Sequence, residues 1–372
     1  MKKNILFMIA FVLTLIGTAC GKENVVQSEL NDASVQIEKN TNSLTSASAD
    51  TSYDFTICFA GDINFDENWC TTQYMDTCSN GILDCIDSTL VDTMKSADIM
   101  WINNEFTYSN GGAPLDGKAY TFRANPSRVE NLSALGVDIV GLANNHVYDY
   151  GNEALLDTFD TLDEANIPYV GAGRNLAEAS APYYMEIEGK TIAFVAASRA
   201  EKYKMTPQAT ENSAGILRCY DTALFDAEIE EADANADYVI ALVHWGTEYS
   251  TELEQVQLDA AKEYIDAGAD AIIGAHSHCL QGMEFYNDVP IVYSLGNYWF
   301  NEKTLDTMLV TLHIYGDDSS SNLEVQITPA LQSNCTTSYV SDSTDQRKLY
   351  DYLESISINV DIDDNGIVTE LD

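Results

Sequence analysis

The sequence predicts an α/β fold in which helices flank a β-sheet and successive strands are joined mainly by right-handed crossovers. Two observations lead to this prediction. Short apolar runs typical of buried strands alternate along the chain with longer amphipathic stretches typical of helices. Polar residues able to bind metal ions follow several of these apolar runs or lie within them, as expected where a sheet delivers ligands from the ends of its strands.

The alternation of strands and helices begins at residue 53. The run YDFTICFAGDINF predicts a strand that ends in Gly61 and Asp62. LVDTMKSADIMWINNEF predicts a helix and then a buried strand ending at Glu105, and PSRVENLSALGVDIVGLANNH repeats that order up to His146. GNEALLDTFDTLDEANIPYVGAG predicts an amphipathic helix followed by a short strand. The first three predicted strands therefore end at candidate ligands.

The same pattern continues through the second half of the chain. KTIAFVAAS predicts a strand bounded upstream by the turn-prone IEGK. DTALFDAEIEEADANADYVIALVHWG and ELEQVQLDAAKEYIDAGADAIIGAHSH each predict a helix and then a strand, ending at His244 and His276. VPIVYSLGNYWF and DTMLVTLHIYG predict further strands. From about residue 316 the chain is more polar, but LEVQITPAL, DQRKLYDYLES and SISINVDI predict a strand, a helix and a strand.

The beginning of the chain is expected to direct export. Residues 1–19 resemble a lipoprotein signal peptide, because two lysines precede an apolar run and small residues lead up to Cys20. Cys20 stands where such proteins are lipidated, although Gly17 replaces the usual Leu. Plain secretion and a retained anchor remain alternatives. We therefore expect the protein at the extracellular face of the bacterial cell membrane, attached by a lipid anchor on Cys20.

Three further segments follow the signal peptide. Residues 20–52 are rich in Ser, Asn, Thr, Asp and Glu without an apolar period, which predicts a disordered tether. Residues 53–315 are predicted to form the α/β domain, and residues 316–372 to form a C-terminal extension packed on it. No segment after the signal is apolar enough and long enough to suggest a membrane-spanning helix.

Charge and cysteine content limit the possible functions. The formal net charge is −41, which should repel nucleic acid and anionic membrane surfaces, so a nucleic-acid partner is disfavoured. Cys58 lies in a predicted buried strand and is expected to be a core thiol. Cys70, Cys78 and Cys85 cluster in a loop-rich stretch, where export would permit one disulfide bond.

Four of the five histidines fall in three short motifs. His146 lies in GLANNHVYDYG, His244 in LVHWGTEY, and His276 and His278 in IIGAHSHC. Asp62 and Glu105 add carboxylates in FAGDINFD and INNEF, and Asn145 adds an amide oxygen. This mixed nitrogen and oxygen set suits zinc, manganese or iron better than calcium or magnesium. On an extended strand, residues two apart face one side, so His276 and His278 can point into one site.

Each of these residues also has an ordinary structural interpretation. A lone Asp after a strand is usually a turn or cap residue, and a single buried His is usually a satisfied polar group. The joint position of all five motifs at strand ends favours a shared site instead. His313 does not lie in a motif with other candidate ligands, and it is interpreted as structural. Asp361–Asp372 starts like a calcium loop, but its flanks are strand-like, and a hairpin turn at Asn365 and Gly366 explains it better.

The ordered motifs GD, NNE, LANNHVYDYG, VHWGTEY, GAHSHCLQGMEFY and IVYSLGNYWF resemble those of the CapA family of capsule or poly-γ-glutamate biosynthesis proteins. The resemblance covers about residues 55–312. That family is similar to calcineurin-like metallophosphoesterases. The resemblance implies a double β-sheet sandwich flanked by helices, with a site for two divalent transition metals, manganese, zinc or iron, at the strand ends.

The resemblance also implies roles for individual residues. Glu105 would bridge the two metals, with Asp62 and His278 completing one site. The second site would use the set Asn145, His244 and His276. His146 would be the catalytic acid, and Asp149 could orient it. The chain departs from the phosphoesterase pattern at Asn64, where a histidine is usual.

Other residues are candidates for contacts around this site. Arg123 and Arg199 are scarce cations near predicted strand ends and could bind an anionic substrate, although ordinary surface pairing would explain them too. Asn297 in YSLGNYWF is a third candidate substrate-binding residue. Glu248 could hydrogen-bond a ligating histidine, or it could be a rim or helix-capping residue.

Two functions from different classes remain. In the first, a surface-anchored CapA-like protein hydrolyses an amide or phosphoester in cell-envelope or capsule polymer metabolism, with an anionic envelope polymer or its precursor as substrate. In the second, the chain is a non-catalytic accessory subunit of a membrane synthase or export complex for that polymer. A solute-binding lipoprotein would fit the tether but would leave the histidine motifs unexplained.

Overall fold

The computed structural model describes residues 51–200 and 205–371. The predicted signal peptide, the lipidation site Cys20 and the predicted tether up to residue 50 lie outside the described residues. Within the described ranges, no helix has both the length and the apolar character that crossing a membrane requires.

The larger sheet has ten strands and contains the start of the domain. Its main path runs in the order β19-β20-β17-β16-β1-β2-β5-β6. Four parallel neighbours form one half: β1 (Tyr53–Ile63), β2 (Ile99–Asn104), β5 (Ile139–Gly141) and β6 (Tyr169–Val170). An antiparallel half follows: β16 (Leu305–Asp317), β17 (Ser320–Ser333), β20 (Ile367–Glu370) and β19 (Val360–Ile362). Two strands pair off this path, namely β15 (Asn297–Trp299) with β1 and β18 (Thr336–Tyr339) with β17.

The second sheet has six strands in the order β13-β14-β12-β11-β9-β8. Its parallel centre comprises β9 (Lys190–Ser198), β11 (Tyr238–His244), β12 (Ala271–Ala275) and β14 (Val289–Val292). Antiparallel strands form its edges, β8 (Tyr183–Ile187) and β13 (Met283–Tyr286). Two small ladders complete the strand pairing: β3 (Thr107–Tyr108) with β4 (Arg123–Ala124), and β7 (Ala172–Gly173) with β10 (Gly215–Ile216).

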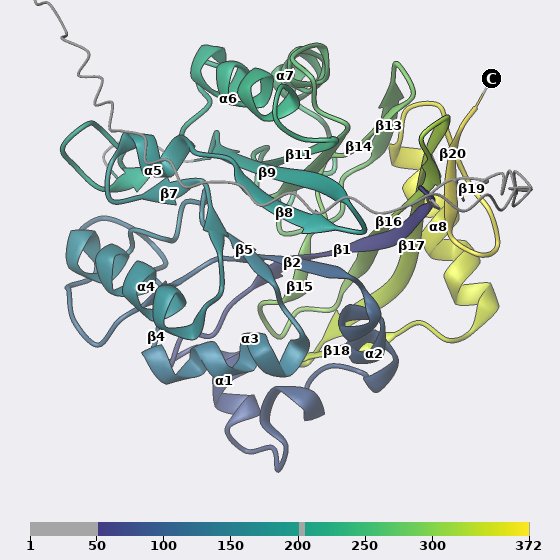
Figure 1. Ribbon diagram of the computed structural model, residues 1–372. Coiled ribbons are helices and arrows are strands. Elements are labelled where there is room, and N and C mark those ends of the chain that lie inside the picture. Colours follow the sequence, from purple (N-terminus) through teal and green to yellow (C-terminus); the bar gives the residue numbers. More distant parts are fainter. Residues whose placement is uncertain (1–50, 201–204, 372) are drawn as a thin grey trace, which may run out of the picture. The chain divides into compact units, whose positions relative to one another are not determined.

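Helices cover the outer faces of both sheets (Figure 1). Those packed against the ten-stranded sheet include α2 (Ser88–Ser96), α3 (Glu130–Leu135) and α4 (Gly151–Ala165). The outer face of the six-stranded sheet carries α6 (Ala223–Asp233) and α7 (Gln255–Asp266). The remaining helical segments are α1 (Cys70–Met75), α5 (Leu176–Ser180), α8 (Ser343–Ile356) and two 3₁₀ turns, η1 (Gly81–Asp84) and η2 (Pro126–Val129).

The central strands are buried on both faces, which explains why they are apolar almost without interruption. In β1, Phe55, Ile57 and Phe59 pack into the core between the two sheets. Cys58 and Ala60 of the same strand face the opposite way, toward the helices. The order of layers is therefore helix, sheet, sheet, helix. This confirms the predicted α/β double-sheet sandwich flanked by helices.

The C-terminal segment is built into the larger sheet. The boundary predicted after residue 315 falls inside β16, and β17 pairs with β16 along its whole length. Leu349 and Leu353 of α8 belong to the core between the sheets. The predicted hairpin in this segment is confirmed, because β19 and β20 pair and the turn is closed by Gly366 N–H donating to Asp363 O at 3.0 Å.

Candidate metal centre

The six predicted ligands come together at the ends of strands from both sheets. Asp62 lies near the end of β1, Glu105 directly after β2 and Asn145 beyond β5. His244 is the last residue of β11, and His276 and His278 follow β12. All six side chains are buried, with 6% or less of each residue exposed. The two sheets therefore deliver three ligands each to one enclosed place.

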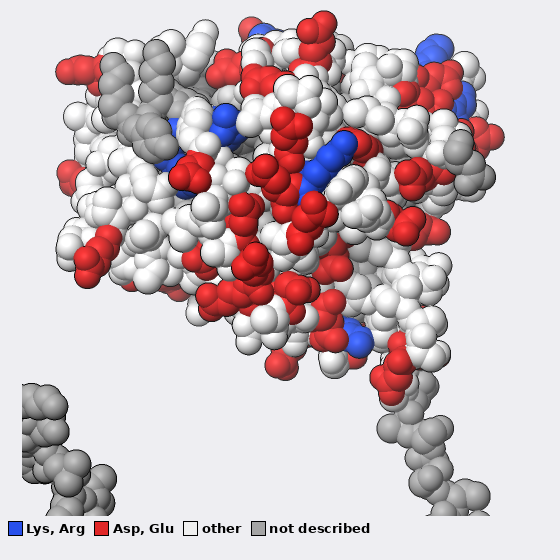
Figure 2. Space-filling model, turned by 90° about the horizontal axis from the view of Figure 1, so that it is seen from above, with Lys and Arg blue, Asp and Glu red and all other residues white. Residues whose placement is uncertain are grey.

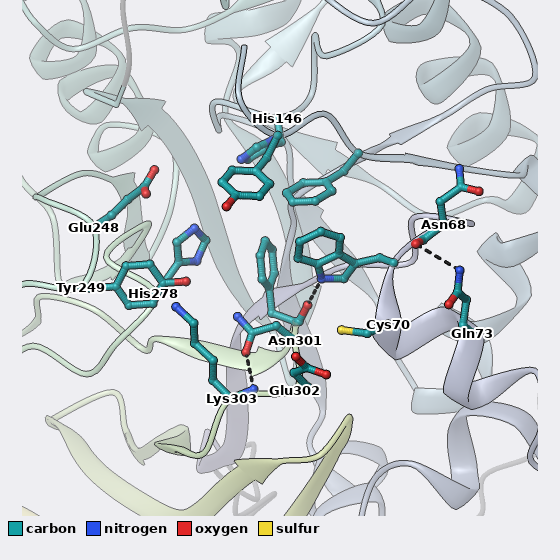
Figure 3. Close-up of a pocket in the computed structure, with 14 residues that line it drawn as sticks. Asn68, Cys70, Gln73, His146, Glu248, Tyr249, His278, Asn301, Glu302 and Lys303 are labelled. Carbon is teal, nitrogen blue, oxygen red and sulfur yellow. Dashed lines mark hydrogen bonds between the residues drawn. The ribbon is translucent and has the colours of Figure 1, made fainter.

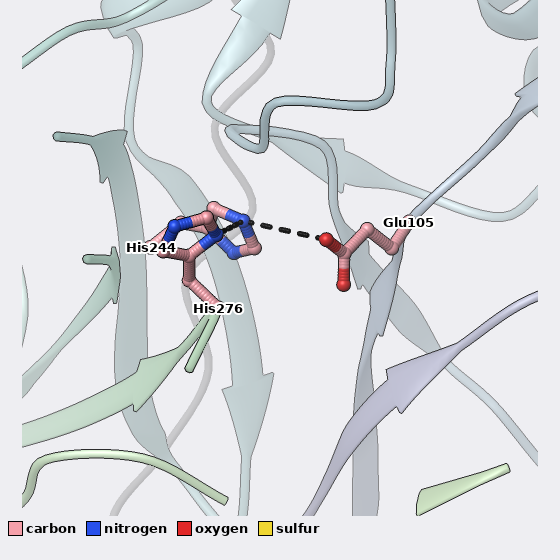
Figure 4. Close-up of side chains that lie close together, drawn as sticks. All are labelled: Glu105, His244 and His276. Atoms are coloured by element: carbon pink, nitrogen blue, oxygen red, sulfur yellow. Dashed lines mark hydrogen bonds and ion pairs between the residues drawn. The ribbon is translucent and has the colours of Figure 1, made fainter. Parts of the chain in front are cut away.

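The ligands form two groups that share Glu105. One group comprises Glu105, His244 and His276 (Figure 4), and the other Asp62, Glu105 and His278. Within each group the candidate ligand atoms all lie within 4.8 Å of one another. Glu105 Oε1 lies 3.6 Å from His244 Nε2 and 4.0 Å from His278 Nε2. A carboxylate placed between two sets of imidazoles is the arrangement expected of a bridging ligand.

Asn145 adds an amide oxygen to the group that contains His244. Its Oδ1 lies 2.8 Å from His244 Nε2, and His276 Nδ1 lies 3.0 Å from the same nitrogen. These are the three residues that the family resemblance assigns to the second site, whose role as ligands stays a prediction. Three electron-pair donors thus converge on one point, as they would around a cation.

The donor set fits a metal because one of its atoms has no hydrogen-bond partner among the described residues. No hydrogen-bond donor in the described part of the chain reaches Glu105 Oε1, which is fully buried. A buried carboxylate oxygen without a partner is costly, and a bound cation would relieve the cost. Burial raises the pKa of Glu105 well above its ordinary value, and the neighbouring charge of Asp62 raises it further.

Two of the three candidate histidine ligands are held in the form that binds metal. Burial lowers the pKa of His244 well below its ordinary value, and the proximity of His276 and His278 adds to the effect. Burial also lowers the pKa of His276 to about 3. These two rings are therefore neutral near pH 7, so a metal ion would not have to displace a proton from them.

The reason predicted for the convergence of His276 and His278 is wrong. Strand β12 ends at Ala275, and the two histidines lie in a loop instead of on an extended strand. Their φ angles are 98° and 55°, in the left-handed region. Such backbone strain persists only where the surroundings impose it, and it is frequent at functional sites. Asn297 helps to hold the loop, since its Oδ1 lies 2.8 Å from His278 Nδ1.

His146 lies beside the ligands, with a different set of contacts. Its Nδ1 lies 2.6 Å from Asp149 Oδ2, and its Nε2 lies 3.9 Å from Glu105 Oε1. Asp149 also accepts a hydrogen bond from the Phe122 N–H at 2.7 Å and pairs with Lys118 Nζ at 2.6 Å. The contact by which Asp149 could orient His146 is therefore present, and His146 presents Nε2 to the site.

Asn64 is not one of the grouped ligands. Its Oδ1 accepts a hydrogen bond from the Asp66 N–H at 2.8 Å, which uses the amide oxygen locally. Its Nδ2 is buried without a hydrogen-bond partner in the described residues. The replacement of the usual histidine therefore leaves no strong donor at this position.

The predicted substrate-binding arginines make other contacts. The Arg123 guanidinium donates to Gly111 O at 2.7 Å and lies 4.2 Å from the centre of the Tyr150 ring. Arg199 donates to the carbonyl oxygens of Cys219 and Tyr220 at 3.3 and 3.1 Å. Asn297 is fully buried against His278. Substrate contacts by these three residues stay predictions.

Two residues that contact the carboxylates of the site, Asn103 and Lys118, were not predicted. Asn103 Nδ2 donates to Asp62 Oδ1 at 2.7 Å and lies 3.3 Å from Glu105 Oε2, so it joins the two carboxylates. The signal was available, because Asn103 stands two residues before Glu105 and residues so spaced share a face of a strand. Lys118 lies in a long loop, where no periodic pattern marks it.

A pocket of about 490 Å³ opens beside the ligands (Figure 3). His146 and His278 form part of its wall, and five aromatic side chains also line it, namely Trp69, Tyr120, Phe122, Tyr249 and Phe300. Among the described residues, Lys303 is the one Lys or Arg that lines it, and its Nζ lies 3.7 Å from the centre of the Tyr249 ring. Glu248 and Glu302 add negative charge. The pocket is large enough for a small substrate or one unit of a polymer.

Comparison with known proteins gives a family match over most of the folded part. Residues 56–302 match the family described as bacterial capsule synthesis protein PGA_cap. The PGA biosynthesis protein CapA of Bacillus subtilis (strain 168) is 34% identical over 215 residues, which are 57% of this chain and 56% of the relative. The capsule biosynthesis protein CapA of Bacillus anthracis is 34% identical over 208 residues, 54% and 50% of the two chains. The match thus spans about half the length of these relatives.

Solved structures with a similar arrangement include two nucleotidases. One is a putative 5'-nucleotidase from Staphylococcus aureus in complex with alpha-ketoglutarate, with a TM-score of 0.44 and 17% identity over 81% of this chain and 58% of that one. The other is the NAD nucleotidase of Haemophilus influenzae, with a TM-score of 0.41 and 12% identity over 85% and 58% of the two chains.

Proposed function

The chain belongs to the bacterial capsule synthesis protein family, and from that premise we propose that it is a metal-dependent hydrolase of a cell-envelope polymer. The observation that carries the proposal is the pair of ligand groups joined by Glu105, whose Oε1 has no hydrogen-bond partner among the described residues. Glu105, Asp62 and His278 would hold one divalent transition metal. Asn145, His244 and His276 would hold the second together with Glu105.

Two metals in such a site would supply Lewis-acid activation of water and of the bond to be cleaved. The residues of the chain supply the rest of the chemistry. His146 acts as the general acid, because its Nε2 faces the ligands while Asp149 fixes its Nδ1. Lys118 neutralises Asp149, so this buried carboxylate is held between a cation and an imidazole.

The pocket favours an elongated substrate with an anionic group. Aromatic rings can pack against an aliphatic or amide chain, and Lys303 can bind a carboxylate or phosphate. Two acidic residues line the same pocket, so the anion must bind at the Lys303 side. A γ-glutamyl amide and a phosphoester both meet these requirements. The first agrees with the family, whose curated relatives are named for PGA or capsule biosynthesis.

A second function is favoured by Asn64. Its amide oxygen is occupied by the Asp66 N–H, which leaves the metal pair with one donor fewer than a phosphoesterase usually has. In this alternative, the chain is a non-catalytic accessory subunit of a membrane synthase or export complex, and its metal site is structural. Attachment to the outer face of the membrane through Cys20 is part of both proposals.

Metal content and hydrolysis together separate the two proposals. Elemental analysis of the purified full chain is expected to find about two transition-metal ions per chain. His276→Ala should lose at least one of them, because it removes a donor from the group that contains His244. His313→Ala is the matched control, since His313 lies in β16 and pairs with Asp54 on the surface, so its metal content should equal that of the wild type.

The outcome decides how the site is studied further. Two ions that are lost in His276→Ala justify a hydrolysis screen with γ-glutamyl amides and phosphoesters. A wild-type chain that holds one ion, and hydrolyses neither substrate class after metal addition, would replace the hydrolase by the accessory subunit. A chain that binds no transition metal at all would refute both metal-based functions.

A further inference from the structure

Two buried asparagines lie behind the candidate metal ligands and bind one another. Asn144 is fully buried, and 3% of Asn103 is exposed. Asn103 stands in β2 two residues before Glu105, and Asn144 stands in the loop after β5, two residues before His146. Asn144 Nδ2 donates to Asn103 Oδ1 at 3.2 Å. The two amides therefore link the loop that carries His146 to the strand end that carries Glu105.

The side chain of Asn144 fits its surroundings in only one orientation. Its Oδ1 accepts hydrogen bonds from the backbone N–H groups of His146 at 3.1 Å and Val147 at 3.0 Å. Its Nδ2 donates to Asn104 O at 2.9 Å as well as to Asn103. An amide turned by 180° would place its NH₂ group against two N–H donors and its oxygen against two acceptors. These four contacts therefore determine which atom of Asn144 faces Asn103.

The orientation of Asn144 determines the orientation of Asn103 in turn. Asn103 Oδ1 must face the donor on Asn144, so its Nδ2 points toward the candidate ligands. This nitrogen donates to Asp62 Oδ1 at 2.7 Å and to Glu105 Oε2 at 3.3 Å, and His244 Nδ1 is its most distant neighbour of the three at 3.4 Å. An amide nitrogen carries two hydrogens, which is enough for one bond to each carboxylate.

Each carboxylate thus has one oxygen occupied by Asn103 and a second oxygen turned toward other candidate ligands. For Glu105 the second oxygen is Oε1, which lies 3.6 Å from His244 Nε2 and has no hydrogen-bond partner among the described residues. For Asp62 it is Oδ2, which lies 3.1 Å from His278 Nδ1. Hydrogen bonds to the remaining polar atoms of metal ligands are a general means of orienting those ligands.

We propose that Asn103 and Asn144 are positioning residues that decide which oxygen of each carboxylate binds metal. The selected atoms are Glu105 Oε1 and Asp62 Oδ2. This inference rests on the proposed function, in which these carboxylates hold the metal pair. Asn103 acts on the carboxylates directly, whereas Asn144 acts by holding Asn103. Because Asn144 also binds the backbone N–H of His146, one side chain aligns the carboxylates with the proposed general acid.

Titration of the metal-free full chain with Mn²⁺ and, in parallel, with Zn²⁺ tests the role of Asn103. Asn103→Ala should weaken metal binding by roughly 10- to 100-fold, the usual effect of removing a group that orients metal ligands. Asn104→Ala is the matched control, because Asn104 is the fully buried neighbour in β2 and its side chain donates to Phe106 O instead. Its metal affinity should equal that of the wild type.

Infrared difference spectra, recorded with and without Mn²⁺, provide a readout that a merely structural role of Asn103 would not change. The wild type should show carboxylates bound through one oxygen. In Asn103→Ala the second oxygens of Glu105 and Asp62 are released, so bands of carboxylates bound through both oxygens should appear. Asn104→Ala, recorded at the same Mn²⁺ concentration, corrects for acidic residues on the surface and should match the wild type.

Asn144→Ser tests the link between the two amides without changing any group that touches the carboxylates. A serine hydroxyl can still accept an N–H bond from the following residues, although more weakly, but its side chain is shorter and does not reach Asn103. Metal affinity should therefore fall, by less than in Asn103→Ala. In the double variant the loss should equal that of Asn103→Ala alone, because Asn144 then has no amide to hold.

The possible outcomes separate this inference from the proposed function. Wild-type affinity in folded Asn103→Ala, or in Asn144→Ser, overturns the inference and leaves the proposed metal site intact. Unchanged carboxylate bands in Asn103→Ala overturn the selection of oxygens. Additive losses in the double variant would show that Asn144 does not act through Asn103. A wild-type chain that binds no transition metal refutes the proposed function and the inference together.

Discussion

His146 is the residue whose contacts differ most from those of the candidate ligands around it. It touches Asp149 through Nδ1, whereas Asn145, His244 and His276 lie against one another. His146→Ala is therefore expected to keep the metal content of the wild type. Turnover should fall by roughly 10²- to 10⁴-fold, since a positioned general acid contributes about that much.

The measurement is kcat on the best substrate from the hydrolysis screen, together with elemental analysis. Asp149→Asn keeps the side-chain shape but removes the charge that fixes the ring. It should cause a smaller loss of kcat with no loss of metal. If His146→Ala lost its metal, the residue would be a ligand and the assignment of its role would be wrong.

At the residue scale, the sequence predicts the candidate metal ligands better than the residues that hold them in place. Asp62, Glu105 and the histidines could be found because each belongs to a motif at a strand end. Asn103 was missed although it hydrogen-bonds both carboxylates, because an Asn in a strand has many ordinary roles. The left-handed φ angles of His276 and His278 were missed as well, since they arise from packing against distant residues such as Asn297.

At the scale of elements, the approach of β1 to the loop before β15 positions two candidate ligands, Asp62 and His278, at once. The Asp62 N–H donates to Gly296 O at 2.9 Å, and Asn297 next to it contacts His278. Gly61 makes this approach possible, because a Cβ there would lie 2.0 Å from Gly296 O. Backbone cannot move aside as a flexible side chain would, so the two elements must separate when a side chain is added.

Gly61→Ala is therefore expected to weaken both folding and metal binding. The overpacking should lower the free energy of unfolding by about 1–3 kcal/mol. Metal affinity should fall as well, because Asp62 and the Asn297 contact to His278 are displaced together. Urea unfolding and metal titration would measure the two effects.

Gly117→Ala is the control for a change of backbone preference alone. Gly117 has a φ of +80°, and a Cβ there would meet open space. The expected cost is about 1–2 kcal/mol for the left-handed conformation, with metal affinity unchanged. Equal metal affinity in wild type and Gly61→Ala would show that the contact of β1 with Gly296 does not position the ligands.

For the whole molecule, the sequence predicts that strands and helices alternate but not which strands become neighbours. The strand β1 pairs with β16, more than two hundred residues later, and β8 begins a separate sheet. A strand that is buried on both faces has no polar side to reveal its partner. The division into two sheets therefore came from the resemblance to a family, while the local pattern indicated only an α/β fold.

The charge of the whole molecule acts against the substrate that the family suggests. The chain has 59 acidic and 18 Lys or Arg residues, and acidic side chains are scattered across the face seen in Figure 2, where basic ones are fewer. An anionic polymer would be repelled over a distance set by the ionic strength. The screening length is about 30 Å at 0.01 M salt and about 8 Å at 0.15 M. Lys303 provides positive charge only at close range.

Salt should therefore assist binding of an anionic substrate. With γ-glutamyl oligomers, KM is expected to fall several-fold between about 0.01 and 0.15 M salt, because screening removes the long-range repulsion. KM for an uncharged amide should stay constant over the same range.

Lys303→Met should raise KM for the oligomer at every salt concentration with little change in kcat. Lys262→Met, which removes a cation paired with Glu284 outside the pocket, is the control. A KM that rises with salt would show that local attraction, and not the net charge, governs binding.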